Sequence, residues 1–494
     1  MSPRLPDRIR LTEDLEISRV VTGLWQVADM ERGGTPLDRE KASSDLMDYA
    51  RVGLDSFDMA DHYGSAELIA GRLLERVRSG EAAGSNRPTV FTKWCPPPGP
   101  MTAEVVRAGV ARSLDRLGID CVDLMQFHWW TFEHLAWLDA MKGLAALQAE
   151  GRIKAIGVTN FDTDHLRVLV KHGIPVVTNQ VSFSLIDRRA AEEMSAFCLA
   201  TGVRLLAYGT LGGGLLSQQW LGRPEPGVGD IGDWSKMKYR RFVEAAGGWQ
   251  VLQRLIAALD RVAAKYASTI SNVATRWVLD HAAVAAVIVG ARLGESEHRA
   301  DTLKLFDLAL DDDDRAELAE ATGGLRRIPG DCGDEYRKPP FLTASGDLSH
   351  HLEQVPKVYA ATPVDGRPDR FIVNSGSVWE PLCGFSRAVR VKDRIQVSGT
   401  TATNGAGEVV APGDAAAQTV FILDKIAASL AALGGSLKDV VRTRIFLADV
   451  DDWEAVSRVH GRVFAGVLPA NSLLEVGRLV GDYRVEIEAE AELG

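Results

Sequence analysis

The sequence predicts an α/β fold, a (β/α)8 barrel followed by a smaller α+β domain, and three observations carry this prediction. A short apolar strand, a loop and an amphipathic helix alternate eight times over roughly the first 300 residues. The strands are apolar along their length, as in parallel sheets that are buried on both faces. After about residue 370 the order of elements changes, and 494 residues make two domains the default expectation.

Eight units of this kind fit a closed barrel better than an open doubly wound sheet. The expected strands lie near 20–25, 54–58, 89–93, 122–127, 153–158, 176–181, 203–208 and 285–289. The expected helices lie near 36–52, 65–79, 102–117, 134–150, 163–172, 189–201, 249–281 and 294–305. Residues 8–17 predict a small hairpin before the barrel, and a last helix is expected near 312–321, capped by acidic residues.

Composition narrows the class of protein. An apolar fraction of 46% and a charged fraction of 25% are typical of a soluble globular protein. The net charge of -11 argues against a nucleic-acid or anionic-membrane partner, and no apolar run is long enough to span a bilayer. The five cysteines lack CxxC spacing and predict reduced thiols in a cytoplasmic protein. His350-His351 has no further ligand at metal-binding spacing, so no metal site is expected.

Unusual polar or aromatic residues stand at the ends of most expected strands. In such barrels the active site lies at the carboxyl ends of the strands. Each residue alone has an ordinary structural explanation, but independent coincidences at most strand ends of one barrel are improbable. The residues are Trp25, Asp58 with Tyr63, Lys93, His128, Thr159-Asn160, Gln180, Tyr208 and Gly290-Ala291-Arg292.

Four of these residues make a coherent proton-transfer site. A tyrosine can donate a proton, but its ordinary pKa is about 10. An ammonium such as that of Lys93 stabilises the phenolate of Tyr63, and Asp58 would pair with the ammonium in a partly dry barrel mouth. His128 can orient or polarise a carbonyl oxygen. No side chain in this set donates a hydride, so a redox cofactor is implied.

These residues resemble the catalytic tetrad of the aldo-keto reductases in type, order and approximate spacing. The matching segments include Asp58-x4-Tyr63-Gly64-x2-Glu67, Gln126-Phe127-His128 and Ile156-Gly157-Val158-Thr159-Asn160-Phe161. Asn179-Gln180-Val181 and Leu206-Ala207-Tyr208-Gly209-x-Leu211 also match, so the resemblance covers about 1–320. It implies reversible NAD(P)H-dependent reduction of an aldehyde or ketone, with Tyr63 as proton donor.

The same resemblance implies where the cofactor binds. Thr159, Asn160 and Gln180 would hold the nicotinamide amide, and Tyr208 would stack on its ring. Arg292 and Arg299 could grip a 2′-phosphate, which favours NADP, with NAD as the alternative. The candidate cofactor-binding residues are Trp25, Thr159, Asn160, Gln180, Tyr208, Gly209, Leu211, Gly290, Arg292 and Arg299.

A long segment after the seventh expected strand is a candidate for a further part of the site. Residues 227–232 fit G-x-G-x-x-G but follow Arg223-Pro224-Glu225-Pro226 rather than a strand, so a Rossmann phosphate loop is not expected. Residues 212–248 are instead expected to form a long loop that covers the cofactor or shapes the substrate pocket. Trp129 and Trp130, directly after His128, are candidate pocket walls, with core packing as the alternative for each.

The expected domains are 1–325 for the barrel, 326–369 for a linker or barrel-wrapping tail, and 370–494 for the second domain. Strands near 386–391 and 394–399, a helix at 413–433, a strand at 440–447, a helix at 451–465 and strands at 472–478 and 483–491 predict a mixed sheet with two helices on one face.

Residues 385–492 resemble the Rid (YjgF/UK114) family, small trimeric proteins of which some hydrolyse enamines and imines. The matching segments include Val397-Ser398-Gly399-Thr400, Pro469-Ala470 and Val485-Glu486-Ile487-Glu488-Ala489. Glu486 matches a family acid that positions water. Asn471 stands where the deaminases carry arginine, and asparagine cannot make a bidentate pair with a carboxylate. A role in oligomerisation or ligand binding is therefore favoured over deaminase catalysis, and a homotrimer is the first expectation.

The sequence thus predicts a cytoplasmic aldo-keto reductase that acts on a small carbonyl substrate. Two alternatives stay open at this point. The barrel could be a non-enzymatic NADP-binding redox sensor, or the chain could be bifunctional, with an imine- or enamine-hydrolysing second domain.

Overall fold

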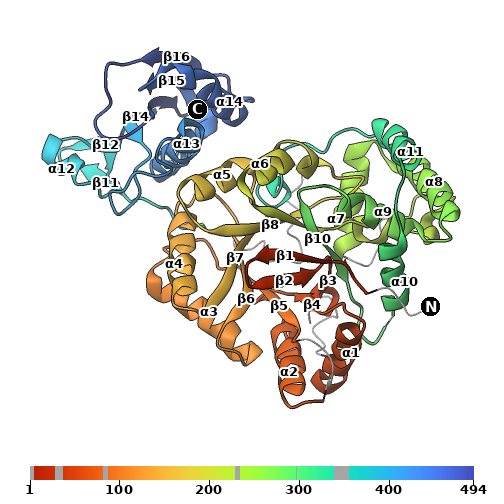
Figure 1. Ribbon diagram of the computed structural model, residues 1–494. Coiled ribbons are helices and arrows are strands. Elements are labelled where there is room, and N and C mark those ends of the chain that lie inside the picture. Colours follow the sequence, from red (N-terminus) through yellow and green to blue (C-terminus); the bar gives the residue numbers. More distant parts are fainter. Residues whose placement is uncertain (1–4, 28–36, 82–86, 228–233, 296, 339–354) are drawn as a thin grey trace.

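The computed structural model describes residues 5–27, 37–81, 87–227, 234–295, 297–338 and 355–494. Figure 1 shows a large α/β barrel and a smaller domain, which lies beside the barrel helices α4 and α5. The G-x-G-x-x-G segment, apart from Gly227, and His350-His351 fall outside the described residues.

The barrel is closed by eight parallel strands in the order β10-β3-β4-β5-β6-β7-β8-β9. All eight predicted strands are confirmed. Their bounds are β3 Val20–Gly23, β4 Ser56–Asp58, β5 Thr89–Trp94, β6 Val122–His128, β7 Ile153–Thr159, β8 Val176–Ser182, β9 Arg204–Tyr208 and β10 Val284–Gly290.

The predicted N-terminal hairpin is β1 (Arg8–Thr12) paired with β2 (Leu15–Ser18). Its buried side chains Leu15 and Ile17 belong to the same apolar cluster as Val21, Phe91 and Leu124 from barrel strands. The hairpin therefore covers the amino-terminal end of the barrel interior, and the opposite rim is left for the functional side chains (Figure 1).

Helices surround the barrel. Their bounds are α1 Arg39–Arg51, α2 Ala66–Arg78, α3 Ala103–Leu117, α4 Trp137–Ala149, α5 Thr163–Lys171, α6 Glu193–Thr201, α7 Trp234–Ala246, α8 Trp249–Lys265, α9 Ile270–Leu279, α10 Arg299–Leu303 and α11 Asp312–Gly323. The acid run does cap α11, because the Asp311 side chain accepts from the Asp314 N–H and the Asp314 side chain accepts in return from the Asp311 N–H.

Two helix predictions are corrected. The single helix expected at 249–281 is broken into α8 and α9, because Ala267 has a left-handed φ of 48° and Thr269 caps the new helix by accepting from the Asn272 N–H. The loop expected at 212–248 contains α7. There Tyr239, Phe242 and Val243 are buried at helical spacing in a cluster that also includes α8 residues.

The second domain is a seven-stranded mixed sheet in the order β11-β12-β13-β14-β17-β15-β16. The bounds are β11 Ala361–Val364, β12 Arg367–Val373, α12 Trp379–Cys383, β13 Ala388–Val391, β14 Arg394–Thr401, α13 Ala415–Ala432, β15 Val440–Leu447, α14 Trp453–Phe464, β16 Ala470–Glu475 and β17 Val485–Glu492. Strands β11 and β12 and helix α12 are not predicted from the sequence. The sheet consequently begins before the predicted boundary at 370, which falls inside β12.

Helix α13 has the length and apolar composition of a membrane-spanning segment, yet 78% of it is buried in the structure. Val485, Ile487, Ala489 and Ala491 of β17 are buried and alternate with less buried residues, as expected when one sheet face packs on a helix. Helix α13 is therefore the core helix of this domain.

The two domains meet where α5 packs along α13. Several polar side chains pair across this contact, beside an apolar cluster that both domains share. His165 lies between Asp162 and Asp424, at 2.7 Å and 3.1 Å, Arg462 pairs with Asp164 at 2.5 Å, and Lys142 pairs with Glu408. Trp137 and Phe421 add an edge-to-face aromatic contact with ring centroids 6.3 Å apart.

Candidate active site at the barrel rim

Asp58 and Lys93 form a buried ion pair at the carboxyl end of neighbouring strands. Lys93 Nζ lies 2.5 Å from Asp58 Oδ2, and each side chain is 5% exposed. The other oxygen of Asp58 accepts from Gln126 Nε2 and Gln180 Nε2, both at 2.8 Å. Such complete pairing is what a buried charge requires.

Tyr63 lies over this ion pair. The ammonium of Lys93 is 5.3 Å from the centroid of the Tyr63 ring, and Trp25 meets the same ring edge to face at 4.9 Å. The loop that carries Tyr63 is anchored from below, where buried Glu67 accepts from Thr92 Oγ1 at 2.6 Å and pairs with Arg116 at 3.2 Å. The rim thus brings Asp58, Tyr63 and Lys93 together.

His128 ends β6 on the same rim and is 5% exposed. Its ring stacks on Trp130 at 4.3 Å and meets Tyr336 edge to face at 5.4 Å. Burial, followed by the positive charges of Arg337 and Lys93, lowers the pKa of His128 well below its ordinary value. Its Nε2 is buried and has no hydrogen-bond partner among the described residues. A neutral imidazole with an unused nitrogen suits a carbonyl oxygen.

The next three strands carry the residues expected to bind a nicotinamide. Thr159 Oγ1 is buried and has no hydrogen-bond partner among the described residues. Asn160 holds a left-handed φ of 58° and accepts from the Tyr208 hydroxyl at 2.8 Å. Gln180 is tied to Asp58 and to Gln126. An unpaired buried hydroxyl next to a strained, anchored amide fits a polar ligand group at this place.

Two glycines of the rim allow neighbouring protein side chains to pack directly against the backbone. A Cβ on Gly209, whose φ is 70°, would lie 2.0 Å from the Tyr239 hydroxyl, and a Cβ on Gly290 would lie 2.3 Å from Gln26 Oε1. Leu211 packs against the apolar cluster that contains α7 and α8. The backbone here is fixed by packing.

A pocket of about 300 Å³ lies at the far end of the same rim. Its lining residues are Lys41, Asp45, Tyr49, Leu293, Gly294, Glu295, Glu297 and Arg299. Arg299 pairs with Glu297 at 2.8 Å and with Asp48 at 3.3 Å, and its guanidinium lies 5.4 Å from the Tyr49 ring centroid. Arg292 pairs with Glu295 at 3.6 Å. Both arginines that were expected to read a 2′-phosphate already face carboxylates.

A short turn after the barrel, Asp334–Tyr336, lies against the site, and no sequence motif marks it. Glu335 is fully buried and pairs with Arg189 at 2.8 Å, and its Oε1 accepts from the Tyr208 hydroxyl at 3.3 Å. Tyr336 accepts from Lys238 Nζ at 2.8 Å. The tail therefore contributes to the wall of the site.

Of the two predicted pocket tryptophans, only Trp130 joins the site. Trp130 clusters with Cys95 and Tyr336 beside His128. Trp129 is fully buried in the main core, where it stacks on Phe127 at 5.6 Å and donates to the His134 carbonyl. The alternation of side chains beyond the strand end turns these neighbours to opposite sides.

In the second domain, Asn471 and Glu486 do not converge within one chain. Asn471 is exposed and pairs with Thr443, whereas Glu486 pairs with Phe446, three residues further along β15 and on its other side. Three residues correspond to roughly 10 Å of strand. Burial raises the pKa of Glu486, and its carboxylate covers Gly399, where a Cβ would lie 1.9 Å from Oε1.

Comparisons with known proteins agree with this division. The aldo/keto reductase family model matches residues 19–322, and the model described as endoribonuclease L-PSP matches residues 377–493. The NADH-specific methylglyoxal reductase of Escherichia coli is 25% identical over 64% of this chain and 98% of its own length. The 3-aminoacrylate deaminase RutC of Acinetobacter baylyi is 35% identical over 26% of this chain and 99% of its own length.

The fold has a solved counterpart. The glycerol dehydrogenase of Gluconobacter oxydans is 22% identical, with a TM-score of 0.53 over 67% of this chain and 98% of that one. The first family model covers more than half of the chain. The chain belongs to the aldo/keto reductase family, and a Rid domain follows its barrel.

Proposed function

We propose that the barrel catalyses reversible reduction of a small aldehyde or ketone, with Tyr63 as the proton donor and NADH as the preferred reductant. The observation that carries the proposal is the buried Asp58–Lys93 ion pair beneath Tyr63. Bound nicotinamide would supply the hydride that no side chain of the site can supply.

The tetrad divides the proton chemistry among its members. Asp58, held by two glutamine amides, keeps the Lys93 ammonium in place. The ammonium stabilises the phenolate that forms when Tyr63 gives its proton to the substrate oxygen. His128 is held neutral, so it can hydrogen-bond the carbonyl oxygen without adding a second cation to the site.

The residues present fit a nicotinamide cofactor. Thr159 Oγ1 has an unused hydrogen bond for a carboxamide. Gln180 pairs with Thr159 on the neighbouring strand, and Asn160 directly follows β7. Tyr208 is held by Asn160 and Glu335, which fixes its ring for stacking. These residues bind and orient the cofactor in our proposal.

The charges around Arg299 favour NADH over NADPH, in contrast to the preference expected from the sequence. Three carboxylates, Asp45, Glu295 and Glu297, line the pocket against the two cations Lys41 and Arg299. A 2′-phosphate would have to displace Glu297 from Arg299 and would then lie close to Asp45 and Glu295. The repulsion between these negative charges disfavours its binding. The name of the E. coli relative, which is NADH-specific, supports the same preference.

Steady-state assays of the purified chain test the proposed reaction. Small aldehydes and ketones, methylglyoxal among them, should consume NADH and yield the corresponding alcohol in equal amounts, with a higher kcat/KM than with NADPH. Tight NADH binding without turnover of any carbonyl compound would instead support the redox-sensor alternative.

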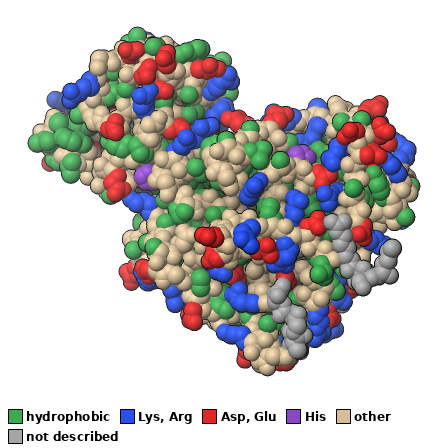
Figure 2. Space-filling view, in the orientation of Figure 1, with side chains coloured by type: hydrophobic (Ala, Val, Ile, Leu, Met, Phe, Trp, Pro, Cys, Tyr) green, Lys and Arg blue, Asp and Glu red, His purple; other side chains and the backbone are tan. Residues whose placement is uncertain are grey.

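We further propose that the Rid domain holds the chain in a homotrimer. Hydrophobic side chains gather around α12 at the far end of this domain (Figure 2). Val378 and Leu382 are each 73% exposed, Trp379 is 53% exposed and Phe385 is 37% exposed. A contiguous apolar surface of this kind is typical of a protein interface. Because Asn471 cannot supply the bidentate pair that an arginine makes with a carboxylate, imine hydrolysis is not proposed for this domain.

Light scattering after gel filtration measures the oligomer directly. The trimer has about three times the 53.6 kDa mass of the chain. Trp379→Ser combined with Leu382→Ser should shift the distribution toward monomer, whereas Leu199→Ser, at an exposed leucine on the barrel, should leave it unchanged. A monomeric wild-type chain would contradict this proposal.

The cysteines of the described structure are free, which supports a cytoplasmic location.

A further inference from the structure

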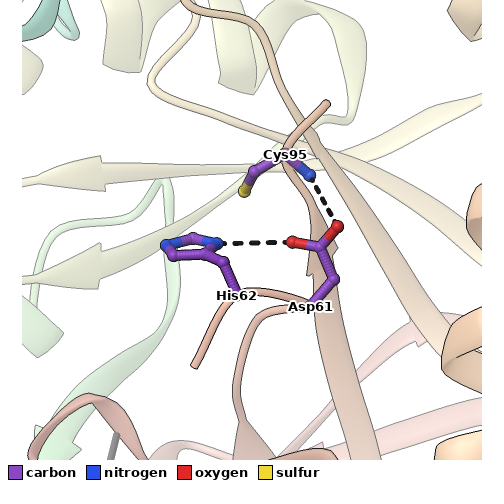
Figure 3. Close-up of side chains that lie close together, drawn as sticks. All are labelled: Asp61, His62 and Cys95. Carbon is purple, nitrogen blue, oxygen red and sulfur yellow. Dashed lines mark hydrogen bonds and ion pairs between the residues drawn. The ribbon is translucent and has the colours of Figure 1, made fainter. Parts of the chain in front are cut away.

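Asp61, His62 and Cys95 form a compact group of side chains beside the tetrad (Figure 3). Asp61 and His62 lie in the loop after β4, and Cys95 directly follows β5. One ligand atom from each residue lies within 4.8 Å of the other two. Asp61 and Cys95 are buried and His62 is half-buried. The group shares its loop with Tyr63 but contains no member of the tetrad.

These three side chains offer the donor types that Zn²⁺ prefers, a thiolate, an imidazole and a carboxylate. With ligand bonds of about 2.0–2.3 Å, tetrahedral coordination separates ligand atoms by roughly 3.3–3.6 Å. The Nδ1 of His62 and the Oδ1 of Asp61 are 3.3 Å apart. From separations of up to 4.8 Å, the sulfur needs to approach by at most about 1.5 Å, a distance that rotation about one side-chain bond can cover.

We propose that Asp61, His62 and Cys95 bind one Zn²⁺ ion at the rim of the barrel, with a water molecule completing its coordination. Neither family resemblance supplies this site, and no metal-binding motif in the sequence predicts it. His62 and Cys95 are 33 positions apart in the sequence, so they form no recognisable motif. The pairing of neighbouring strands β4 and β5 brings them together in the fold.

The surroundings already orient the carboxylate. Asp61 Oδ2 accepts from Arg112 at 2.9 Å and from the Cys95 N–H at 3.5 Å, so Oδ1 is the oxygen turned toward His62. Arg116 donates to the Asp61 carbonyl at 2.6 Å and fixes the backbone. Hydrogen bonds of this kind, one shell beyond the ligands, are what hold ligands of metal sites in place.

Binding requires loss of the thiol proton. Zinc binds the thiolate form of cysteine, and metal binding therefore displaces the thiol proton. The step is therefore Zn²⁺ plus Cys–SH giving Zn–S–Cys plus one H⁺, which passes to the buffer. The thiolate and the Asp61 carboxylate together balance the two positive charges of the ion, and the imidazole binds as a neutral ligand.

Metal analysis of the full-length chain tests the proposal without reference to turnover. The chain is stripped with a chelator, incubated with Zn²⁺, dialysed and analysed by mass spectrometry for zinc. Wild type and Cys383→Ser, which removes an exposed cysteine elsewhere, should each retain one ion. Cys95→Ser and His62→Gln should bind Zn²⁺ about tenfold more weakly or worse.

Two further readouts identify the ligands. The Co²⁺-substituted wild type should show sulfur-to-cobalt charge-transfer absorption that Cys95→Ser lacks. Calorimetry in buffers of different ionisation enthalpy should show one proton released per ion. Circular dichroism checks that each variant is folded. If Cys95→Ser does not fold, zinc retention by His62→Gln tests the site instead. Wild type that retains no zinc, or a folded Cys95→Ser or His62→Gln that retains as much as wild type, would overturn the site.

Discussion

Asp58 illustrates how much of the site depends on single side chains, because each of its oxygens has donors inside the barrel. Lys93 pairs with one oxygen, and the amides of Gln126 and Gln180 reach the other. A charge buried this deeply is tolerated only when it is fully paired. A buried ion pair contributes little net free energy to folding, so the arrangement is better explained by its position, which holds an ammonium under Tyr63.

Lys93→Gln should lower kcat for carbonyl reduction by about 10²–10⁴-fold, because the phenolate of Tyr63 loses its ammonium while the side chain at 93 can still hydrogen-bond. The decline of the reduction rate at alkaline pH should move to higher pH, since the phenol then holds its proton more strongly. Rate against pH measures both effects. Lys154→Gln, on β7 and outside the site, is the control, and an unchanged kcat for Lys93→Gln would exclude the relay.

Glu297→Gln tests the cofactor preference at one residue. Removing the carboxylate that lies 2.8 Å from Arg299 frees the guanidinium for a 2′-phosphate. NADPH should then bind about tenfold more tightly, with little change for NADH. Fluorescence titration measures both affinities. Glu317→Gln, in the exposed Arg261–Glu317 pair, should change neither, and an equal gain for both cofactors in Glu297→Gln would refute the charge argument.

At the scale of elements, the turn Asp334–Tyr336 is the part of the site that lies furthest along the chain from the rest. Glu335 and Arg189 are both 1% exposed or less. Although burial opposes ionisation, Arg189 and Lys238 hold the pKa of Glu335 down to about 2. The turn is thus fixed in place by one buried ion pair, and it presents Glu335 to Tyr208 and Tyr336 to His128.

Glu335→Gln should destabilise the barrel by about 1.5–3 kcal/mol, because the buried Arg189 guanidinium loses one of its two carboxylate partners and keeps its pair with Asp187. It should also weaken cofactor binding, since Tyr208 loses a carboxylate that accepts from its hydroxyl. Chemical denaturation and NADH titration measure the two effects. The exposed Glu320→Gln on α11 should behave as wild type. A fully stable Glu335→Gln would show that the turn is held by other contacts.

The sequence predicts the barrel strands well and the helices between 212 and 281 less well. Strands buried on both faces form clear apolar runs in the sequence. The polar residues at the ends of these runs, Asp58, Lys93 and His128, indicate where the site lies. Helix α7 could have been found from Tyr239, Phe242 and Val243 at helical spacing, but the glycines and prolines around it outweighed that pattern. The break between α8 and α9 depends on a left-handed alanine, which no propensity predicts.

On the scale of the whole molecule, the sequence could not reveal contacts between distant segments. Asp334–Tyr336 joins the site through burial and one ion pair, and the alternation of Trp129 and Trp130 depends on how the strand ends. The contact between domains is likewise a product of the fold. His165 is stacked on Phe132, with ring centroids 3.4 Å apart, and bridges Asp162 of the barrel to Asp424 of the Rid domain.

This bridge predicts a pH-dependent stability. Burial disfavours the charged ring, but Asp162 and Asp424 outweigh it and raise the pKa of His165 to about 9. A raised pKa gives stability that is complete below pH 6.5 and is lost progressively as pH rises through about 9. The full effect is about 3 kcal/mol. Melting curves from pH 6 to pH 9.5 should show this loss for wild type.

His165→Gln should remove most of that pH dependence and be less stable than wild type at pH 6, because the amide carries no charge for the two carboxylates. His298→Gln, at an exposed histidine, should keep the wild-type profile. If wild type and His165→Gln lost stability in parallel between pH 6.5 and 9, the bridge would not contribute to the contact between the domains.

The most direct test of the central claim is a single-turnover measurement with Tyr63→Phe. Enzyme loaded with NADH is mixed with a small aldehyde, and the loss of NADH absorbance is followed over time. Wild type should rapidly oxidise one NADH per site, whereas Tyr63→Phe should react about 10²–10⁴-fold more slowly with its NADH affinity retained. Oxidation at the wild-type rate in Tyr63→Phe would contradict the assignment of Tyr63 as proton donor.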